Sequence, residues 1–261
     1  TSIIYFLNSS DFILQSITAL SQNTQLGLDH ISIIAISRIN CQYVQEVLMI
    51  LDGFKFSINF FTQNYIKLLS ILLLPLMLEF TLSISISSLA FSDESIAEGL
   101  RSASSVIIQT WVQCIIVLCL VNRQSPRAVS DLYIYSLYKL PIVILITLIL
   151  GIATVLGLIL FIIPGIYLAI RFVFFIFEIL LSSKKNSEAL QNAFQMTEGR
   201  VFEIFIYLLP LTILFLIFAI LIFSFTDLLI IELLFSYLWI TFSFIYIFYF
   251  YDQIKTDNYE S

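Results

Sequence analysis

The chain has 261 residues, of which 60% are hydrophobic and only 11% are charged. A soluble globular domain carries roughly 25% charged residues, so this composition excludes a soluble protein and indicates an integral membrane protein. The net charge of −6 is spread along the chain without a basic stripe, which argues against nucleic acid as a partner. The apolar runs are continuous and lack the alternation of an outer-membrane barrel, so we predict an all-α fold.

Residues 1–43 mix apolar patches with Asn, Gln and Ser, and no segment among them is long enough to span a membrane. The sequence begins with Thr1, and we expect this segment to be a fragment or a processed form of unclear role. It shows no basic start followed by a single apolar core and a small-residue cleavage site, so we expect no signal peptide.

Residues 44–65 show apolar side chains at helical spacing, with Asp52 and Lys55 mostly on other faces. This pattern predicts an amphipathic helix that runs into the first transmembrane span. The helix lies either in the membrane interface or against the cytoplasmic end of the helix bundle.

A membrane domain of six transmembrane helices is predicted at 66–250, followed by a cytoplasmic tail at 251–261. Each span needs about 20 apolar residues. The six spans are placed at about 66–91, 104–122, 138–162, 166–183, 201–224 and 228–250.

A helical hairpin is predicted for the third and fourth spans. Pro164 and Gly165 interrupt an apolar run that is too long for one helix, and we place the tight turn at this pair. Gly151, Thr154 and Gly157 recur every three residues on the third span. Such small residues predict close packing against the fourth span.

The distribution of Lys and Arg predicts the orientation. One side of the membrane carries ten cations, whereas the other carries Arg101 alone and Arg171 lies inside a span. By the positive-inside rule, both termini are expected in the cytoplasm. The ten are Arg38, Lys55, Lys67, Arg123, Arg127, Lys139, Lys184, Lys185, Arg200 and Lys255.

A second amphipathic helix is predicted between the fourth and fifth spans. Lys184 and Lys185 precede it, Gly199 is expected to end it in a left-handed turn, and Arg200 follows. We expect the helix to lie on the inner leaflet with its basic residues facing anionic lipid. Its narrow apolar stripe consists of Ala189, Leu190, Ala193 and Phe194.

Four ionisable residues fall inside the predicted spans, where an unpaired charge is costly. Glu79 and Arg171 lie at a similar depth, about 20 Å from the cytoplasmic side at ~1.5 Å per residue. Glu232 is a second candidate partner for Arg171, and Glu178 lies on the same face about 10 Å away. These side chains either line a polar cavity for a lipid headgroup or solute, or form an ion pair that fixes helix register. Alternatively, the arginine snorkels to the headgroups.

The stretch around the Pro-Gly pair resembles a known family. The pattern covers roughly 45–250, and its specific part is 157–203. Its residues are Leu160, Pro164, Gly165, Tyr167, Leu168, Ala169, Arg171, Phe172, Glu178, Glu188, Ala189, Leu190, Ala193, Thr197, Gly199 and Arg200. It resembles the six-helix membrane domain fused to some bacterial glycerophosphodiester phosphodiesterases, and the stand-alone YciC-like membrane proteins. The resemblance implies a fold and a place in the bacterial inner membrane, but little chemistry. The family often has Ser in place of Ala193.

The chain offers few residues that could act in catalysis or bind a metal ion. His30 is the single histidine, which argues against a phosphodiesterase, a zinc protease or a Ser-His-Asp hydrolase. The three cysteines are best explained as small buried residues. We therefore expect that the chain is not an enzyme and that it binds no cofactor.

Two functions remain for a protein whose expected partners are membrane lipids. The first is an envelope scaffold, accessory or lipid-interacting domain. The alternative is a small transporter or a lipid-translocating protein. Gln109 and Gln113, four residues apart on one face of the second span, favour this alternative.

Overall fold

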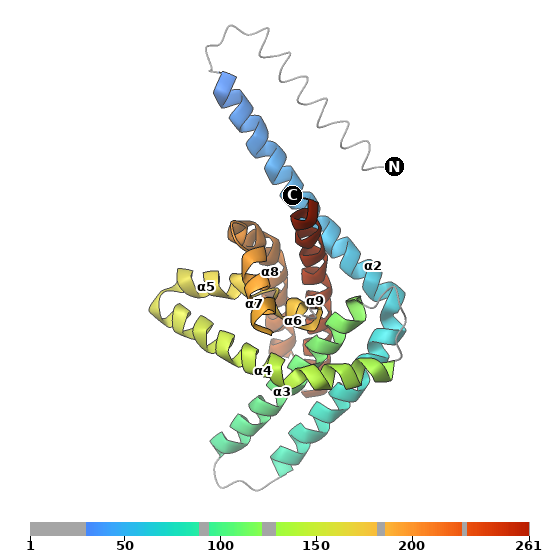
Figure 1. The fold of residues 1–261 in the computed structure, drawn as a ribbon. Helices are drawn as coiled ribbons and strands as arrows, with labels where there is room; N and C mark the ends of the chain where they lie inside the picture. The colour runs from blue at the N-terminus through green and yellow to red at the C-terminus, as the bar shows by residue number, and fades with distance from the viewer. Residues whose placement is uncertain (1–29, 89–93, 122–128, 182–185, 226–228, 261) are drawn as a thin grey trace. The chain divides into compact units, whose positions relative to one another are not determined.

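The computed structural model describes residues 30–88, 94–121, 129–181, 186–225 and 229–260 (Figure 1). It contains two compact units, Thr1–Asp52 and Gly53–Ser261. The described part of the first unit is the beginning of helix α2, and everything below concerns the second unit.

The regular elements in the described ranges are all α-helices. They are α2 His30–Ser88, α3 Glu94–Val121, α4 Val129–Leu160, α5 Ile162–Arg171, α6 Phe175–Leu181, α7 Asn186–Met196, α8 Val201–Phe225 and α9 Leu229–Glu260. Six stretches are long and apolar enough to cross a membrane, which confirms the predicted all-α fold with six spans. They are Val47–Ser88, Glu94–Val121, Val129–Leu160, Ile162–Leu181, Val201–Ile222 and Leu229–Thr256.

The first span continues without a break from the segment predicted as an amphipathic helix at 44–65, because α2 is one helix through both. Apolar side chains in this segment are not all covered: Ile58 and Tyr65 are both exposed. Phe54, in contrast, contacts the rings of Phe242 and Tyr246 on α9. Within the second unit, α2 is therefore held against α9 at Phe54.

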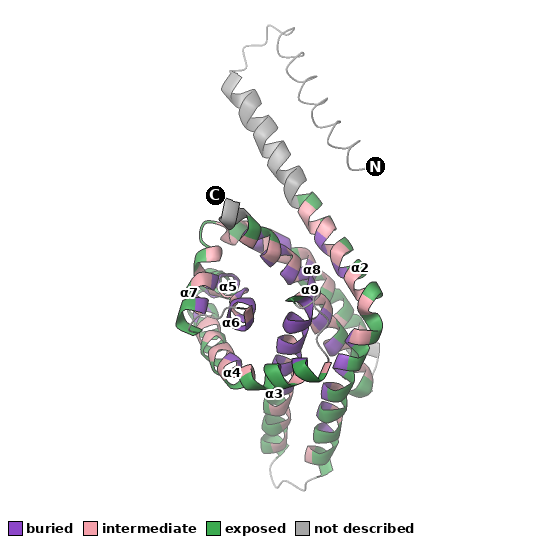
Figure 2. Cartoon of the chain, turned by 45° about the vertical axis from the view of Figure 1, so that its right-hand side comes forward, coloured by how far each residue is buried: buried purple, intermediate pink, exposed green. Residues whose placement is uncertain are grey.

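Helix α3 is the most enclosed span, and α4 is the least. In its most apolar window 61% of α3 is buried, against 11% of α4. Figure 2 shows α4 mainly in green and pink, the colours of exposed and intermediate residues. Helix α4 therefore offers most of its surface to the lipid, whereas α3 supplies buried positions where polar groups need protein partners.

Helices α8 and α9 are joined by a buried pair of tyrosines. The Tyr207 hydroxyl donates to the backbone oxygen of Tyr246 at 3.0 Å, and the Tyr246 hydroxyl donates to the backbone oxygen of Tyr207 at 2.9 Å. Their rings stack with centroids 4.4 Å apart. Gly53 of α2 gives room for this pair, since a Cβ there would lie 2.3 Å from the Tyr207 hydroxyl. The pair fixes the register of the two helices.

The α4–α5 hairpin turns at Phe161, which has extended backbone (φ −157°, ψ 131°). This corrects the predicted position of the turn, because Pro164 and Gly165 lie in the first turn of α5 and not between the helices. Proline is tolerated in a first helical turn, where its missing N–H would have no intrahelical partner. The proline therefore marks the start of the helix.

Glycines let the two arms of the hairpin approach each other. A Cβ on Gly165 would lie 2.5 Å from the backbone nitrogen of Leu158, and a Cβ on Gly157 would lie 3.0 Å from the Cα of Gly165. Gly157 therefore packs against the fourth span, as its small size predicts. Gly151 does not, since a Cβ there would meet no atom within 4 Å.

The fourth span is interrupted after Arg171. A turn at residues 172–174 separates α5 from α6, although the sequence predicts one continuous helix at 166–183. The Phe172 amide donates to the backbone oxygen of Leu168, and the Val173 amide donates to that of Ile170. These bonds close the end of α5 and place Arg171 in its last turn, where a cation is favoured by the helix dipole.

Helix α7 confirms the predicted amphipathic helix before the fifth span. Ala189 and Ala193 are buried along it. Gly199 follows in the left-handed region (φ 74°), as its position predicts. The Ile204 amide then donates to the backbone oxygen of Arg200, so α8 begins at once.

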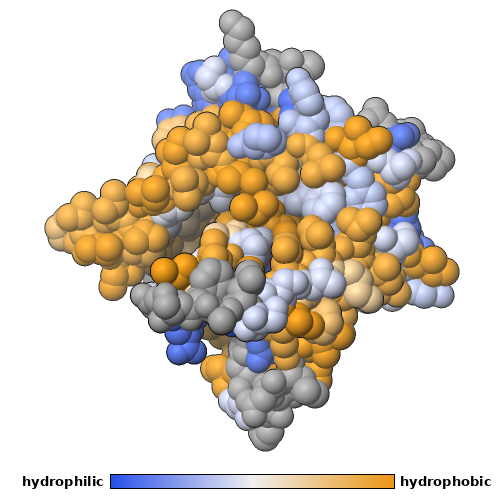
Figure 3. Space-filling view, turned by 90° about the horizontal axis from the view of Figure 1, so that it is seen from below, coloured by the Kyte–Doolittle hydropathy of each residue, from blue (hydrophilic) through white to orange (hydrophobic). Residues whose placement is uncertain are grey.

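Apolar side chains cover most of the face seen in Figure 3. The tip of the α4–α5 hairpin is the extreme case, with Ile159 75% exposed, Phe161 73% and Ile163 81%. In water such a patch would be an aggregation site, whereas in a bilayer it is ordinary lipid contact.

Candidate functional site

A buried carboxylate joins three spans. Glu79 on α2 is 4% exposed, and each of its oxygens accepts a hydrogen bond. The Ser105 hydroxyl of α3 donates to Oε1 at 2.5 Å, and the Tyr237 hydroxyl of α9 donates to Oε2 at 2.5 Å. Gln109 extends this network, since its amide nitrogen donates to the Ser105 hydroxyl at 3.0 Å. We call these four residues the Glu79 cluster.

The cluster lies within three of the spans, more than two helical turns in from the nearer helix ends. Glu79 is nine residues before the end of α2, Ser105 eleven after the start of α3, and Tyr237 eight after the start of α9. At 1.5 Å per residue these positions are about 14, 17 and 12 Å from their helix ends, against a hydrocarbon core of about 30 Å. A carboxylate at this depth is costly unless it is paired or hydrogen-bonded, and both oxygens of Glu79 are bonded here.

A cavity of about 350 Å³ opens beside the cluster, between α2, α3 and α9. We call it the headgroup cavity. Glu79 and Ser105 line it, and Arg101 contributes a guanidinium from α3. Arg101 Nη2 donates to the Ser87 hydroxyl at 2.8 Å, whereas its buried Nε finds no hydrogen-bond partner in the described part of the chain. The remaining lining residues are Ser83, Ser102, Ser104, Val106, Leu229 and Leu233.

Arg171 lies elsewhere, and the structure does not pair it with Glu79 or Glu232. Arg171 is 4% exposed. Its Nη1 donates to the Thr197 hydroxyl at 3.3 Å, and its guanidinium carbon lies 3.6 Å from the ring centroid of Phe194. Residue counting along the spans predicts a similar depth for Arg171 and Glu79, but their helices present them to different neighbours. The predicted ion pair is thus replaced by a cation–π contact with α7.

Glu178 on α6 has a partner that the sequence did not suggest. The Tyr251 hydroxyl of α9 donates to its Oε1 at 2.6 Å, and Lys255 Nζ lies 3.5 Å from the same oxygen. Lys255 also donates to the Tyr251 hydroxyl at 2.8 Å. The carboxylate is 5% exposed. This group holds α6 against α9 and lies away from the headgroup cavity, since none of its residues lines it.

The other predicted positions are dispersed. Glu232 is half-buried in the first turn of α9, where the helix dipole favours an anion. Gln113 is half-buried on α3, one turn beyond Gln109, and it does not line the cavity. Arg200 is half-buried at the start of α8. The predicted lipid-facing residues Lys184 and Lys185 lie outside the described residues.

Sequence reasoning found Glu79 and Gln109 but missed Ser105, Tyr237 and Arg101 as parts of one site. Ser and Tyr are common in this chain, so neither stands out in an apolar span. The predicted second span begins at about 104 and leaves Arg101 outside it, whereas the structure places this residue inside α3. The available signal was its four-residue spacing from Ser105, which puts both on one face of the helix.

No group of three or more His, Cys, Asp and Glu side chains that could hold a metal ion occurs within the described ranges. Cys114 and Cys119 are buried on α3 as free thiols. The polar chemistry of the described site therefore consists of hydroxyls, one amide, one carboxylate and one guanidinium.

The fold and this site define a polytopic α-helical membrane protein with a buried, hydrogen-bonded carboxylate inside its spans. Comparison of the chain with models of protein families, with curated proteins and with solved structures finds no match.

Because Arg171 and Glu79 share no hydrogen-bond partner, the single changes Arg171→Gln and Glu79→Gln should destabilise the protein independently. The free energy of unfolding in detergent should fall by the sum of the two single effects in the double variant, within about 0.5 kcal/mol. A coupling of more than about 1 kcal/mol between the two positions would contradict this expectation and support the ion pair predicted from the sequence.

Proposed function

We propose that this chain is a membrane protein that binds a phospholipid, with the lipid headgroup in the headgroup cavity. The observation that carries the proposal is that Glu79 and Arg101 line one cavity between transmembrane helices. Groups of opposite charge at such a depth are expensive, and in membrane proteins they mark ligand or substrate sites. A binding role of this kind needs no nucleophile or metal, and we propose that the chain is not an enzyme.

The rim of the cavity favours a lipid over a small solute. Val106 and Leu229 line the cavity and are both exposed apolar residues on the spans. A bound molecule would thus contact polar groups inside and hydrocarbon outside. An amphipathic ligand satisfies both surroundings, whereas a water-soluble solute would leave the apolar rim without a matching surface.

We place the protein in the bacterial inner membrane with both termini in the cytoplasm. The excess of Lys and Arg on one side of the predicted topology supports this orientation. The family resemblance of residues 157–203 supports the bacterial inner membrane as the location. In this orientation the headgroup cavity opens toward the extracytoplasmic side, since Arg101 follows the first loop on that side.

A small transporter is the second candidate, and the position of the Glu79 cluster inside the spans favours it. Transporters hold their substrates near the bilayer midplane. Uptake into proteoliposomes that depends on Glu79 would support this candidate, whereas a lipid-binding protein would retain lipid without moving a solute.

The test is the phospholipid that co-purifies with the protein, measured by native mass spectrometry in a mild detergent. Arg101→Gln should reduce the bound fraction by about tenfold, because one charge-assisted hydrogen bond is worth roughly 1.5–3 kcal/mol. Lys139→Gln removes the same charge from α4, outside the cavity, and should leave the bound fraction unchanged. Equal lipid retention by both variants and the wild-type protein would refute the proposal.

A further inference from the structure

The headgroup cavity holds one carboxylate and one guanidinium that are not paired with each other. Arg101 and Ser105 are one turn apart on α3, about 6 Å along the axis, and the Ser105 hydroxyl donates to the Glu79 carboxylate. The cation is thus nearer the helix start and the carboxylate is deeper. A ligand that bridges them needs an anionic group and a cationic group separated by a short spacer.

The Glu79 carboxylate has capacity left for such a cation. A carboxylate offers about four lone-pair sites, and the hydroxyls of Ser105 and Tyr237 use two of them. A primary ammonium donates up to three hydrogen bonds and can use the others. A quaternary ammonium has no N–H to donate and is held instead by aromatic cages. Among the described residues that line the cavity there is no Phe, Tyr or Trp.

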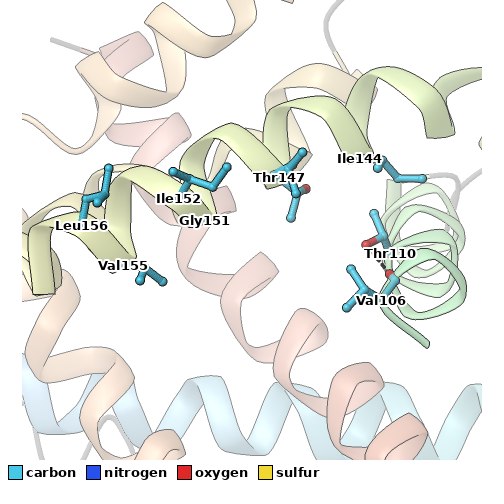
Figure 4. Close-up of a pocket in the computed structure, with 9 residues that line it drawn as sticks. Val106, Thr110, Ile144, Thr147, Gly151, Ile152, Val155 and Leu156 are labelled. Carbon is cyan, nitrogen blue, oxygen red and sulfur yellow. Dashed lines mark hydrogen bonds between the residues drawn. The ribbon is translucent and has the colours of Figure 1, made fainter. Parts of the chain in front are cut away.

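Val106 also lines a second, apolar groove. This groove of about 400 Å³ runs between α3 and α4 (Figure 4), and we call it the tail groove. Figure 4 shows Val106 and Thr110 of α3 across from Thr147, Gly151 and Val155 of α4. The remaining lining residues are Ile144, Leu148, Ile152 and Leu156.

The tail groove has few polar groups that could hydrogen-bond to water. The Thr110 hydroxyl is already bonded to the backbone oxygen of Val106 at 2.7 Å, whereas the buried Thr147 hydroxyl has no hydrogen-bond partner in the described part of the chain. A bound water needs about two to four polar partners, so this one hydroxyl in an otherwise apolar lining does not hold it. The groove lies on the most exposed span, so in a bilayer its occupant is an acyl chain. Because Val106 belongs to both spaces, the chain of a lipid whose headgroup lies near Arg101 can enter the groove directly.

Building on the proposed function, we propose that the ligand is a zwitterionic phospholipid with a primary ammonium, of the phosphatidylethanolamine type. Its phosphate contacts Arg101, its ammonium contacts Glu79, and one acyl chain lies in the tail groove. A net anionic lipid would meet the Glu79 carboxylate without a compensating cation, and this repulsion disfavours it.

The experiment measures retention of three lipids with identical dioleoyl chains by native mass spectrometry: phosphatidylethanolamine, phosphatidylcholine and phosphatidylglycerol. The wild-type protein should retain the ethanolamine lipid about tenfold better than the other two, as expected for one added charge-assisted contact. Glu79→Gln should abolish this preference, and Arg101→Gln should weaken retention of all three lipids.

A fold-tolerant variant guards against loss of structure in Glu79→Gln. Ser102 is exposed and lines the cavity, so Ser102→Lys adds a cation there without disturbing a buried group. It should shift the preference toward phosphatidylglycerol. Equal retention of the three lipids by the wild-type protein, with retention still lost in Arg101→Gln, would overturn the ethanolamine assignment and leave the proposed function intact. Retention that is insensitive to Arg101→Gln would overturn both.

Two further arms test the acyl chain. Gly151→Phe fills the tail groove from a position where a Cβ meets no atom within 4 Å, and it should lower retention of every diacyl lipid at least about fivefold. Water-soluble phosphoethanolamine should not displace the bound lipid at millimolar concentration. Displacement by this compound, or unchanged retention in Gly151→Phe, would contradict the assignment of the tail groove.

Discussion

Replacing Gly165 with alanine should lower the free energy of unfolding by about 3 kcal/mol, the upper end of the range for overpacking. A Cβ at this position would lie 2.5 Å from the backbone nitrogen of Leu158 and from the Leu158 side chain. The backbone cannot rotate away as a flexible side chain can, so the α4–α5 hairpin must open. The measurement is unfolding in a detergent titration followed by circular dichroism.

Gly99→Ala is the matched control, because Gly99 is helical and a Cβ there meets no atom within 4 Å. Alanine favours a helix over glycine by up to about 1 kcal/mol, so this variant should be neutral or stabilised. Gly157→Ala should show an intermediate loss, since its closest contact is 3.0 Å. A Gly165→Ala protein as stable as the Gly99→Ala protein would show that the arms are not in contact.

The second large effect concerns the Glu79 cluster. Glu79→Leu should destabilise the protein by about 2–4 kcal/mol, because it leaves the hydroxyls of Ser105 and Tyr237 buried without their acceptor. Tyr237→Phe should cost about 1.5–3 kcal/mol, the usual value for a hydrogen bond to a charged group. Tyr237 is 1% exposed, so water does not replace the lost bond.

The double variant separates this contact from general loss of packing. Glu79→Leu should cost less in a Tyr237→Phe background than in the wild-type protein, with a coupling of at least about 1 kcal/mol. Additive effects at these two positions would mean that α2 and α9 are not joined through this bond. The pair formed by Glu79 and Arg171 provides the contrast, since no coupling is expected there.

Local signals predicted the local structure. The apolar stripe at Ala189 and Ala193 and the terminal Gly199 predicted α7, because a helix and its left-handed end are decided by neighbours in the chain. The Pro-Gly pair predicted the hairpin but not its turn. Proline is compatible with a first helical turn as well as with a loop, and only the three-dimensional packing of Gly165 on Leu158 separates these cases.

The partners of the buried charges could not be predicted in the same way. Counting residues along a span gives an expected depth in the membrane, and it predicts a similar depth for Glu79 and Arg171. It does not give the rotation of each helix or the order of helices around the bundle. For this reason the sequence predicts Arg171 as the partner of Glu79, whereas in the structure Glu79 accepts hydrogen bonds from the hydroxyls of Ser105 and Tyr237.

The break in the fourth span could not be predicted from its residues either. Residues 172–174 are Phe, Val and Phe, and none of them disfavours a helix strongly. The turn is stabilised by tertiary contacts, including those of Arg171 with Thr197 and Phe194 on and after α7. Such an override of local preference by packing is common for short helical segments.

The most direct test of phospholipid binding is an electron cryo-microscopy structure of the full chain in nanodiscs that contain phosphatidylethanolamine. We expect headgroup density between the Arg101 guanidinium and the Glu79 carboxylate, continuous with an acyl chain that passes Val106 into the groove between α3 and α4. A headgroup cavity that is closed by side chains or filled by water alone, with well-ordered lipid elsewhere on the surface, would contradict the account.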